Sequence, residues 1–473
     1  MRPLYLMVSF WGEKFRSYFT SYCLPSLLSP RNLGLLNSKD GHKFLIATTD
    51  ADWEALRQQP IFAELKKHVE LVFLNIGFPE DDTVAAKFRH MTYADVVLTN
   101  AAHRDRALAC QIKPDTMYTD GTIATVIRYA EQGWHAVLAV AIRLAEEKLF
   151  PPLGAGGFVP VTSSEAPLCI TLPPRQVAKI AARSMFYDNL VNDWDAADFS
   201  RYPGFCFWRV PGTDDLLIHS FYFAYLLIDF SVVEVNDTKS FEAGQSIENT
   251  WLSDNFPDPS KVKVPQDSDE AILLSWTPSP DPIPPRRPRA LLRIPGLATI
   301  WKGWRLRAYW TLHAAAGDVQ KTNNFRHPIH WHAGELTGPE WQRTEARVRR
   351  IMRWFFGDVF AEYDDVPRRH PLRPVMVAWW WALDFVTRSA PRILSHVSIG
   401  WLQVAAVLRG RVWAPMVRLT AAVTAVARIA FRRVGLLVCG DRAAVKWWGW
   451  RVRKLMSGLT GQRFEEPRPP APE

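Results

Sequence analysis

The sequence predicts an α/β protein: a mostly parallel sheet with flanking helices, followed by a basic, tryptophan-rich, mainly helical module. In residues 1–150, short apolar runs alternate with longer amphipathic stretches, which is typical of strand–helix units in a parallel sheet. Charge then divides the chain. Residues 1–285 hold 25 Lys and Arg against 35 Asp and Glu, whereas residues 286–463 hold 31 against 10. We therefore expect an acidic body joined to a basic module.

Length and composition agree with a folded protein of more than one domain. The chain has 473 residues, and 48% of them are apolar, which is enough to bury sizeable cores. Its five cysteines are scattered and form no CxxC pair, which favours reduced thiols over a disulfide framework or a zinc site. The opening "MRPLYLMVSFWG" predicts a first strand rather than a signal peptide.

The first 150 residues alternate predicted strands and helices along the chain. The strands are expected at 3–12, 43–50, 69–77, 116–120 and 135–144, and the helices at 14–29, 52–67, 91–112 and 121–133. Residues 151–285 are less regular, with a helix expected at 172–185 and strands within 216–235 and 258–276. The run 216–235 is as long as a membrane span, but His219 and Asp229 interrupt it, which favours strands.

A proline-rich linker at 277–289 marks the predicted domain boundary. In the module at 286–463, single arginines interrupt runs of Trp, Leu and Val, and the longest uncharged run, 393–408, is shorter than a bilayer span. This pattern favours helices that lie on an anionic membrane surface. A soluble helical bundle and true membrane spans remain alternatives, and nucleic-acid binding is disfavoured because the basic residues do not cluster on a polar face. The tail at 464–473 is expected to be disordered.

Asp120 is the first candidate for chemistry. It ends the predicted strand 116–120 and precedes Gly121, which would let a ligand approach the backbone. A carboxylate at the carboxyl end of such a strand could hold Mg²⁺ or Mn²⁺ against a diphosphate. The alternative is that Asp120 caps the following helix.

Two opening stretches, "VSFWGEKFRSYFTSYCLPSLLSPRNLGLL" and "HKFLIATTDADWEAL", together with the segment around Asp120, resemble bacterial glycosyltransferase-like proteins of the GT-A fold, which use nucleotide sugars. The resemblance covers residues 4–150 well and 151–280 loosely, and it does not reach the basic C-terminus. It implies a nucleotide-sugar-binding half at 1–150 and an acceptor half at 151–285. The family's Asp-x-Asp stands here as Tyr118-Thr119-Asp120, with one carboxylate, and Asp115 lies five residues earlier.

The same resemblance implies further ligand-binding residues. Trp11 and Gly12 would border the nucleotide, together with Gly121, and Asp50 would accept hydrogen bonds from the base or ribose. Asp120 would bind the metal. The alternative for Asp50, with equal weight, is a structural role as a turn residue or cap at the start of the following helix.

Two further polar groups stand out. Asp267, Asp269 and Glu270 precede a predicted strand, and their mutual repulsion is expected to raise at least one pKa, as a general base for glycosyl transfer requires. A solvated turn is the alternative. His330 and His332, with Glu335, could bind zinc. His219 is interpreted as a core histidine rather than a catalytic one.

The sequence thus predicts a glycosyltransferase that moves a sugar from a nucleotide-sugar donor to a lipid-linked or cell-envelope polysaccharide acceptor. It would act at the inner face of the cytoplasmic membrane, attached peripherally through its basic module. Two alternatives stay open. One is a catalytically degenerate GT-A-like protein that serves as a membrane-bound binding or scaffold protein. The other is a metal-dependent hydrolase built on His330, His332 and Asp269.

Overall fold

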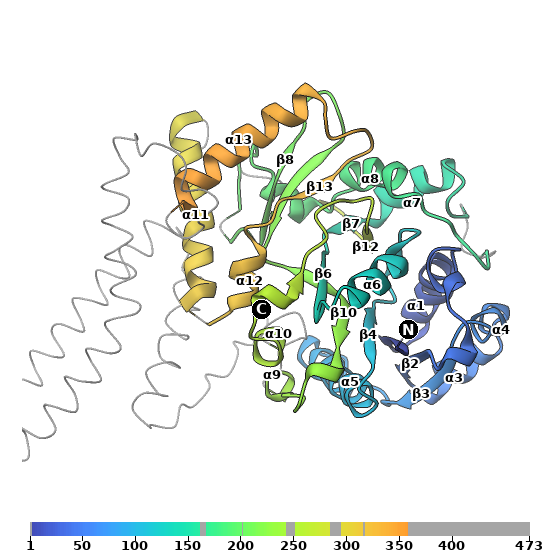
Figure 1. Ribbon diagram of the computed structural model, residues 1–473. Helices are drawn as coiled ribbons and strands as arrows, with labels where there is room; N and C mark the ends of the chain where they lie inside the picture. The colour runs from blue at the N-terminus through green and yellow to red at the C-terminus, as the bar shows by residue number, and fades with distance from the viewer. Residues whose placement is uncertain are drawn as a thin grey trace, which may run out of the picture. The chain divides into compact units, whose positions relative to one another are not determined.

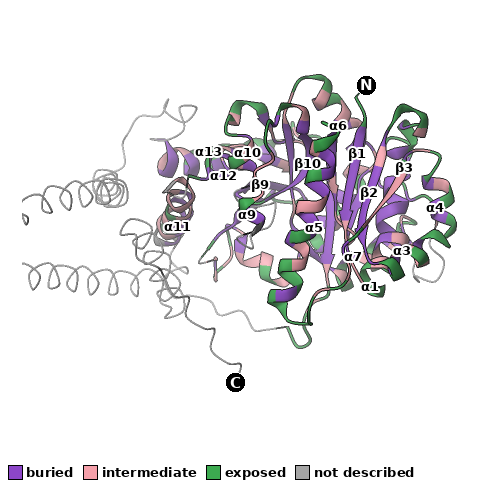
Figure 2. Cartoon of the chain, turned by 90° about the horizontal axis from the view of Figure 1, so that it is seen from below, coloured by how far each residue is buried: buried purple, intermediate pink, exposed green. Residues whose placement is uncertain are grey.

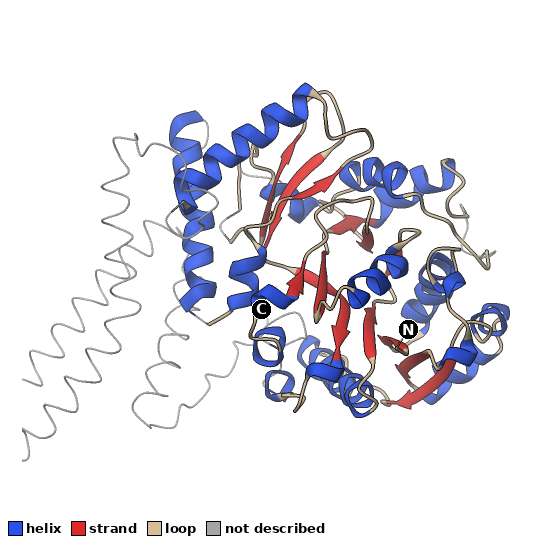
Figure 3. Ribbon diagram, in the orientation of Figure 1, coloured by secondary structure: helices blue, strands red, loops and turns tan. Residues whose placement is uncertain are grey.

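The computed structural model describes residues 2–160, 167–200, 202–242, 251–283, 295–315 and 317–357. The chain divides into two compact units, Met1–Val366 and Pro367–Glu473, and every described element belongs to the first. Figures 1 and 3 show its helices and strands. The described strands form one sheet of seven strands and two sheets of three.

The seven-stranded sheet is mostly parallel. Its order is β11 (Val262–Lys263), β6 (Ala136–Val140), β10 (Phe223–Asp229), β4 (Leu108–Ile112), β1 (Leu4–Ser9), β2 (Lys43–Thr48) and β3 (Glu70–Asn75). Only β10 runs against its neighbours, β4 and β6, while the other adjacent pairs are parallel. This arrangement, with helices on both faces, confirms the predicted α/β fold class and is consistent with a GT-A-like fold.

Burial on both faces explains why the strand sequences are continuously apolar. In β1, Leu4, Leu6 and Val8 join one buried cluster, while Tyr5 and Met7 join the other. Successive side chains point to opposite faces of a sheet, so a strand covered on both sides needs apolar residues at every position. Figure 2 shows the central strands as buried. Each such side chain contributes roughly 1.5–3 kcal/mol through burial.

Helices cover the two faces of the main sheet. The long helix α5 contributes Ala94, Leu98 and Ala102 to the cluster on one face, and α6 contributes Ile123 and Val126 to the cluster on the other. The α-helices are α1 (Glu13–Tyr18), α2 (Leu24–Leu27), α3 (Asp50–Arg57), α4 (Pro60–Leu65), α5 (Val84–Arg104), α6 (Thr122–Glu131), α7 (Glu146–Ala155), α8 (Pro174–Arg183), α9 (Lys239–Glu242), α10 (Trp251–Asn255), α11 (Pro295–Ala315), α12 (Val319–Asn324) and α13 (Pro339–Phe356). A π-helical segment, Phe19–Cys23, joins α1 to α2.

Two small sheets extend this framework. One has the order β5 (Thr116–Tyr118), β12 (Leu273–Thr277) and β7 (Arg143–Ala145). The other has the order β13 (Ile329–Trp331), β9 (Leu216–Ser220) and β8 (Phe205–Arg209). The run 216–235 is therefore largely β9 and β10, as the strand interpretation expects.

The predicted helix at 91–112 is wrong in its second half. Helix α5 ends at Arg104, and residues 108–112 form β4, which pairs with β1 in parallel. The alanine-rich stretch suits a helix by local propensity. Pairing with β1 and the burial of all residues of β4 except Gln111, which is partly buried, override that preference. The predicted fourth strand is β5, which lies in a small sheet, so β4 takes the central place beside β1.

Part of the segment after the proline-rich linker packs into the same compact unit. Strand β13 pairs with β9, and helices α11, α12 and α13 follow the linker within the described residues. No helix in this part of the chain is long and apolar enough to cross a bilayer. The rest of the predicted membrane-surface module, from residue 358 onward, and the predicted disordered tail lie outside the described residues.

Candidate functional site

The strand order of the main sheet reverses between β1 and β4. From β1 the chain adds β2 and β3 on one side, and β4 then joins the other side of β1. In open parallel sheets, ligands bind outside the carboxyl ends of the strands at this kind of reversal. The residues that follow β1 and β4 at this place, 10–12 and 113–115, are called the switch-point edge below.

Gly12 and Asp52 hold the first loop of the switch-point edge in place. The Gly12 amide donates to Asp52 Oδ2 over 2.8 Å, and Arg16 donates to Asp52 Oδ1 over 2.6 Å. Thr49 Oγ1 donates to the same carboxylate, whose side chain is 3% exposed. Gly12 itself has φ 84°, a backbone conformation that a side chain would disfavour. A buried carboxylate therefore fixes the loop after β1 to the end of β2.

Trp11 forms an aromatic contact beside this loop. Its ring centroid lies 4.8 Å from that of His90, with the two rings nearly perpendicular. Burial lowers the pKa of His90, and the Gly77 carbonyl only partly offsets this effect, so the imidazole is neutral at pH 7. Trp11 is half-buried, so part of its indole ring can stack against a ligand.

Asp50 opens α3 at the neighbouring strand end. It is exposed and accepts a hydrogen bond from Asn75 Nδ2 over 2.7 Å, which joins the ends of β2 and β3. The residue that caps α3 is Thr49, whose hydroxyl accepts from the Asp52 amide. Asp50 is thus beside the switch-point edge and in contact with solvent.

The second loop of the switch-point edge contains two cations and a carboxylate. Lys113 follows β4, and burial lowers its pKa to about 8, with the Arg143 charge adding to the effect and Asp115 and Asp95 opposing it. Arg143 pairs with Asp115 and donates to the Trp276 carbonyl over 3.0 Å. At neutral pH Lys113 is still protonated, so two positive charges stand where β4 ends. Such a pair suits a phosphate or diphosphate group.

Asp120 does not lie at the switch-point edge. It follows β5, and the whole of that strand separates it from Asp115. Its Oδ1 accepts from the Arg31 amide over 2.9 Å, and its own amide donates to the Leu172 carbonyl. The cap of α6 is Gly121, at φ 97° and with no side-chain capping bond. Arg31 lies close to Gly121, so both residues face this arginine's loop.

The surroundings of Asp120 do not fit a divalent metal. Mg²⁺ and Mn²⁺ prefer several oxygen ligands, and Asp120 offers one carboxylate that already accepts a backbone hydrogen bond. Asp120 is not part of the cluster of described His, Cys, Asp and Glu side chains that could share an ion. That cluster, described below, consists of Asp267, Asp269 and His332.

The three predicted carboxylates before β12 separate toward three different cations. Asp267 pairs with His332, Asp269 with Arg175, and Glu270 with Arg128. The hydrogen bond from His332 holds the pKa of Asp267 below its ordinary value, against the opposing effect of burial. The expectation that mutual repulsion raises a pKa is wrong for Asp267. Each of the three carboxylates pairs with a basic side chain, and this attraction outweighs the repulsion between the acids at Asp267.

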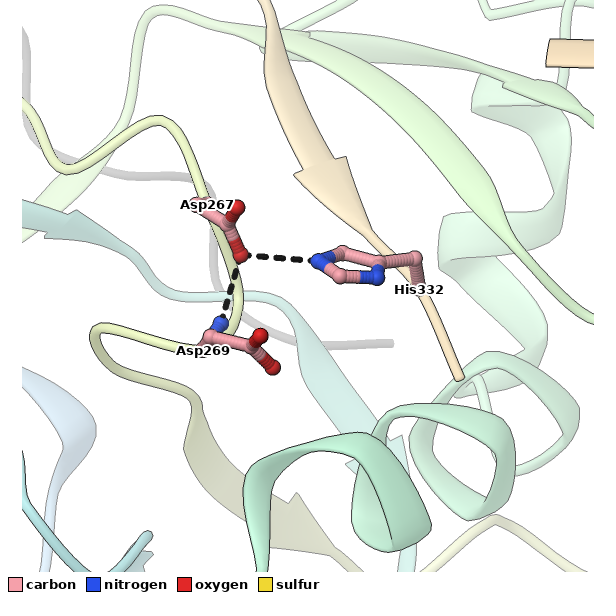
Figure 4. A group of neighbouring side chains, drawn as sticks. All are labelled: Asp267, Asp269 and His332. Atoms are coloured by element: carbon pink, nitrogen blue, oxygen red, sulfur yellow. Dashed lines mark hydrogen bonds and ion pairs between the residues drawn. The ribbon is translucent and has the colours of Figure 1, made fainter. Parts of the chain in front are cut away.

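Asp267, Asp269 and His332 nevertheless form a compact group that could hold a metal ion (Figure 4). One ligand atom from each lies within 4.8 Å of the others. His332 follows β13, and its Nε2 lies 2.8 Å from Asp267 Oδ1, while its Nδ1 lies 2.5 Å from the Gly334 carbonyl. The hydrogen bond to Asp267 raises the pKa of His332 above its ordinary value.

The other two candidate histidines, His219 and His330, have structural partners. His219 is buried, its Nδ1 lies 2.8 Å from the Phe325 carbonyl, and burial lowers its pKa to about 4. This agrees with its interpretation as a core histidine. His330 contacts the Gln266 carbonyl and lies 3.3 Å from Glu345, so it stands outside the group around His332.

Sequence reasoning missed Asp52, Lys113 and Arg143. Asp52 stands three residues after Thr49, which is the spacing of a helix capping box and was visible in the sequence. Lys113 directly follows β4, so correct placement of that strand would have found it. Arg143 had no local signal, because it reaches Asp115 through the pairing of β7 with β12.

Comparisons with known proteins give structural matches only. No protein-family model and no curated protein sequence matches the chain. An apo crystal structure of mouse xyloside xylosyltransferase 1 matches with 15% identity over 36% of this chain and 63% of that chain, with a TM-score of 0.21. A putative glucose-1-phosphate thymidylyltransferase from Bacillus anthracis, in complex with a sucrose, matches with 11% identity over 31% and 57%, with a TM-score of 0.20. This chain spans about six-tenths of the length of either protein.

Proposed function

We propose that the protein is a glycosyltransferase that binds a nucleotide-sugar donor at the switch-point edge. The observation that carries the proposal is the pair of cations at the switch-point edge: Lys113, which directly follows β4, and Arg143, which opens β7, pairs with Asp115 and acts on the charge of Lys113. Oriented cations in a partly buried site are suited to a diphosphate. Trp11, across this edge, offers an aromatic surface to a base.

The donor diphosphate would be held by these side chains without a metal at Asp120. Lys113 supplies a point charge, and Arg143 supplies a planar donor whose partner, Asp115, sets its orientation. Gly12, which has no Cβ and lies in a loop fixed by Asp52, lets a phosphate or ribose approach the backbone. Asp50 and Asn75 offer polar atoms at the neighbouring strand ends.

The acceptor and the place of action belong to the same proposal. A lipid-linked or cell-envelope glycan would be the acceptor, and the basic segment 286–463 would bring the enzyme to the inner face of the cytoplasmic membrane. The composition of that segment supports this, since each Lys or Arg near an anionic surface adds about 1 kcal/mol.

A thermal-shift panel tests the donor site. UDP, GDP, CMP and TDP would each be added with and without Mn²⁺ to wild type and to the Lys113→Met and Asp120→Ala variants. A ligand at a hundred times its dissociation constant adds about 2.7 kcal/mol of stability. We expect a shift with one nucleotide that is lost in Lys113→Met and kept in Asp120→Ala. The matched control is Lys67→Met, which removes an exposed lysine paired with Glu64.

Other outcomes of the panel point elsewhere. A shift that needs Mn²⁺ and disappears only in Asp120→Ala would move the donor site to the end of β5. A flat panel would favour the second candidate, a catalytically degenerate fold that acts as a membrane-bound scaffold. The observation in favour of that candidate is the single carboxylate at Asp120, which is not part of the three-residue group that could hold a metal ion among the described residues.

A further inference from the structure

A group of side chains outside the switch-point edge has the composition of a transition-metal site. Asp267 and Asp269 come from the chain just before β12, and His332 comes from the residue after β13 (Figure 4). Arg175, which donates to Asp269, lies three residues after Leu172, whose carbonyl accepts from the Asp120 amide. We propose that these three side chains bind one transition-metal ion of the Zn²⁺ class, in exchange with the Arg175 guanidinium.

The backbone holds the two ligand-bearing segments in a fixed register. The His330 amide donates to the Gln266 carbonyl over 2.8 Å, and the Ser268 amide donates to the His330 carbonyl over 2.9 Å. Ser268 is fully buried, and its hydroxyl accepts from the His332 amide over 3.2 Å. Residues 268–270 form a turn, in which the Glu270 amide donates to the Asp267 carbonyl over 3.1 Å and the Asp269 amide donates to Asp267 Oδ1 over 2.8 Å, so the turn keeps the two aspartates together. The site is therefore set by main-chain pairing, not by flexible side chains meeting at a surface.

The orientation of His332 suits a metal ligand. Its Nδ1 faces the Gly334 carbonyl, which can only accept a hydrogen bond, so Nδ1 carries a hydrogen. Nε2 is left facing Asp267. A hydrogen bond from the distal nitrogen to a carbonyl is the usual device that fixes a metal-binding histidine. The side chain of His332 is 2% exposed, so the ring cannot turn away without disturbing the core.

Charge also favours a divalent ion. Arg175 donates to both oxygens of Asp269 and to Glu335, so three carboxylates share one guanidinium and the imidazole of His332. The three carboxylates and the guanidinium together carry two excess negative charges, which one divalent ion would balance.

Arg175 and the metal would compete for Asp269. The ligand atoms are as far as 4.8 Å apart, whereas bonds of about 2.0–2.2 Å bring ligands to within roughly 3.5 Å of each other. Asp269 must therefore rotate toward His332, which requires Arg175 to release it and keep Glu335. One imidazole and two carboxylates match Zn²⁺ better than Mg²⁺, which prefers oxygen ligands and retains its waters.

Calorimetric titration of the metal-stripped full chain with Zn²⁺ tests the proposal. We expect one equivalent to bind in wild type, binding at least tenfold weaker in Asp269→Asn and in His332→Gln, and little heat with Mg²⁺ at the same concentration. The decisive variant is Arg175→Met, which should bind Zn²⁺ more tightly because the competing cation is gone. If the group were only a salt-bridge network, Arg175→Met would lower stability without creating tighter zinc binding.

Three controls separate this site from other zinc ligands and from misfolding. Glu270→Gln changes a neighbouring acid that pairs with Arg128, and Cys169→Ser removes an exposed thiol, so both should leave zinc binding unchanged. The unfolding midpoint in urea reports whether each variant is folded. Absence of zinc uptake in both wild type and a folded Arg175→Met would overturn the proposal, as would unchanged uptake in a folded His332→Gln.

Discussion

The Asp52 carboxylate accepts a hydrogen bond from the Gly12 amide over 2.8 Å and so joins the loop after β1 to the helix after β2. Forty residues separate the two in the sequence. Arg16 and Thr49 also donate to this carboxylate. The loop that would border a nucleotide therefore depends on one buried acid.

Replacing Asp52 with Ala should destabilise the protein and loosen this loop. Loss of hydrogen bonds to a buried charge costs roughly 1.5–3 kcal/mol, because the donors are left without an acceptor. Urea unfolding would measure the change. Glu54→Ala, which removes an exposed partner of Arg57, is the matched control and should stay within about 0.5 kcal/mol of wild type. Equal effects of the two substitutions would contradict the role given to Asp52.

Nucleotide affinity should fall as the pH rises through about 8. Burial lowers the pKa of Lys113 to about 8, so its charge is lost over this range, while a nucleoside diphosphate keeps constant charge well above its second pKa of about 6. The dissociation constant of the nucleotide that the thermal-shift panel selects would be measured from pH 7 to 9.5. The Lys113→Arg variant keeps its positive charge over this pH range, so its nucleotide affinity should not depend on pH in this way. A flat profile in wild type would exclude Lys113 from the site.

The His332–Asp267 pair should stabilise the fold most in mildly acidic solution. The pKa of His332 is raised above 6.5, so its contribution is full below that value and is lost as the pH rises through the raised value. The pKa of Asp267 is lowered below 3.8, so its contribution is present above that value and is lost on further acidification. The difference in unfolding free energy between wild type and His332→Gln should thus be largest near pH 5 and should shrink toward pH 8. A difference that grows with pH would contradict the pairing.

His219 should make the fold sensitive to acid. Its pKa falls from 6.5 to about 4 on burial, so below pH 6.5 the unfolded chain binds a proton that the folded chain refuses. Stability attributable to this group should decrease by about 3 kcal/mol between pH 6.5 and 4. His219→Gln should show a shallower decline over the same range in pH-dependent urea unfolding. Parallel profiles for the two proteins would mean that His219 is protonated in the folded state.

Removal of residues 367–473 should weaken binding to anionic vesicles strongly, because more than half of the Lys and Arg of the basic segment 286–463 lie in this part. The division between units falls after Val366, and a cut at 290 would also remove β13, which pairs with β9. Cosedimentation with vesicles that contain phosphatidylserine would compare the full chain with the shortened one. Each basic residue lost costs about 1 kcal/mol of attraction. Neutral vesicles are the control, and equal pelleting of both chains would end the membrane proposal.

The sequence could predict much of the fold, and it singled out Asp267, Asp269 and His332, but it grouped His332 with His330, which instead contacts Glu345. Apolar runs located β1, β2, β3 and β6. In β1, β2 and β6 the runs are apolar throughout because these strands are buried on both faces. The stretch that forms β4 looked helical, since it directly follows the alanine-rich run of α5 and its state depends on pairing with β1. Because of this one error, the fourth strand was predicted to end at Asp120, and Lys113 was not recognised as the residue that follows β4.

The sequence by itself determined the α/β class, the acidic body with its basic module, and the candidate residues Trp11 and Gly12 after the first strand. Local patterns carry that information. Only the tertiary structure decided which charges meet. Asp115 reaches Arg143, Asp269 reaches Arg175, and Asp267 reaches His332 through pairings between segments 28, 94 and 65 residues apart. A side chain's partner, and with it the side chain's pKa and chemistry, is set by such long-range packing, which no local pattern records.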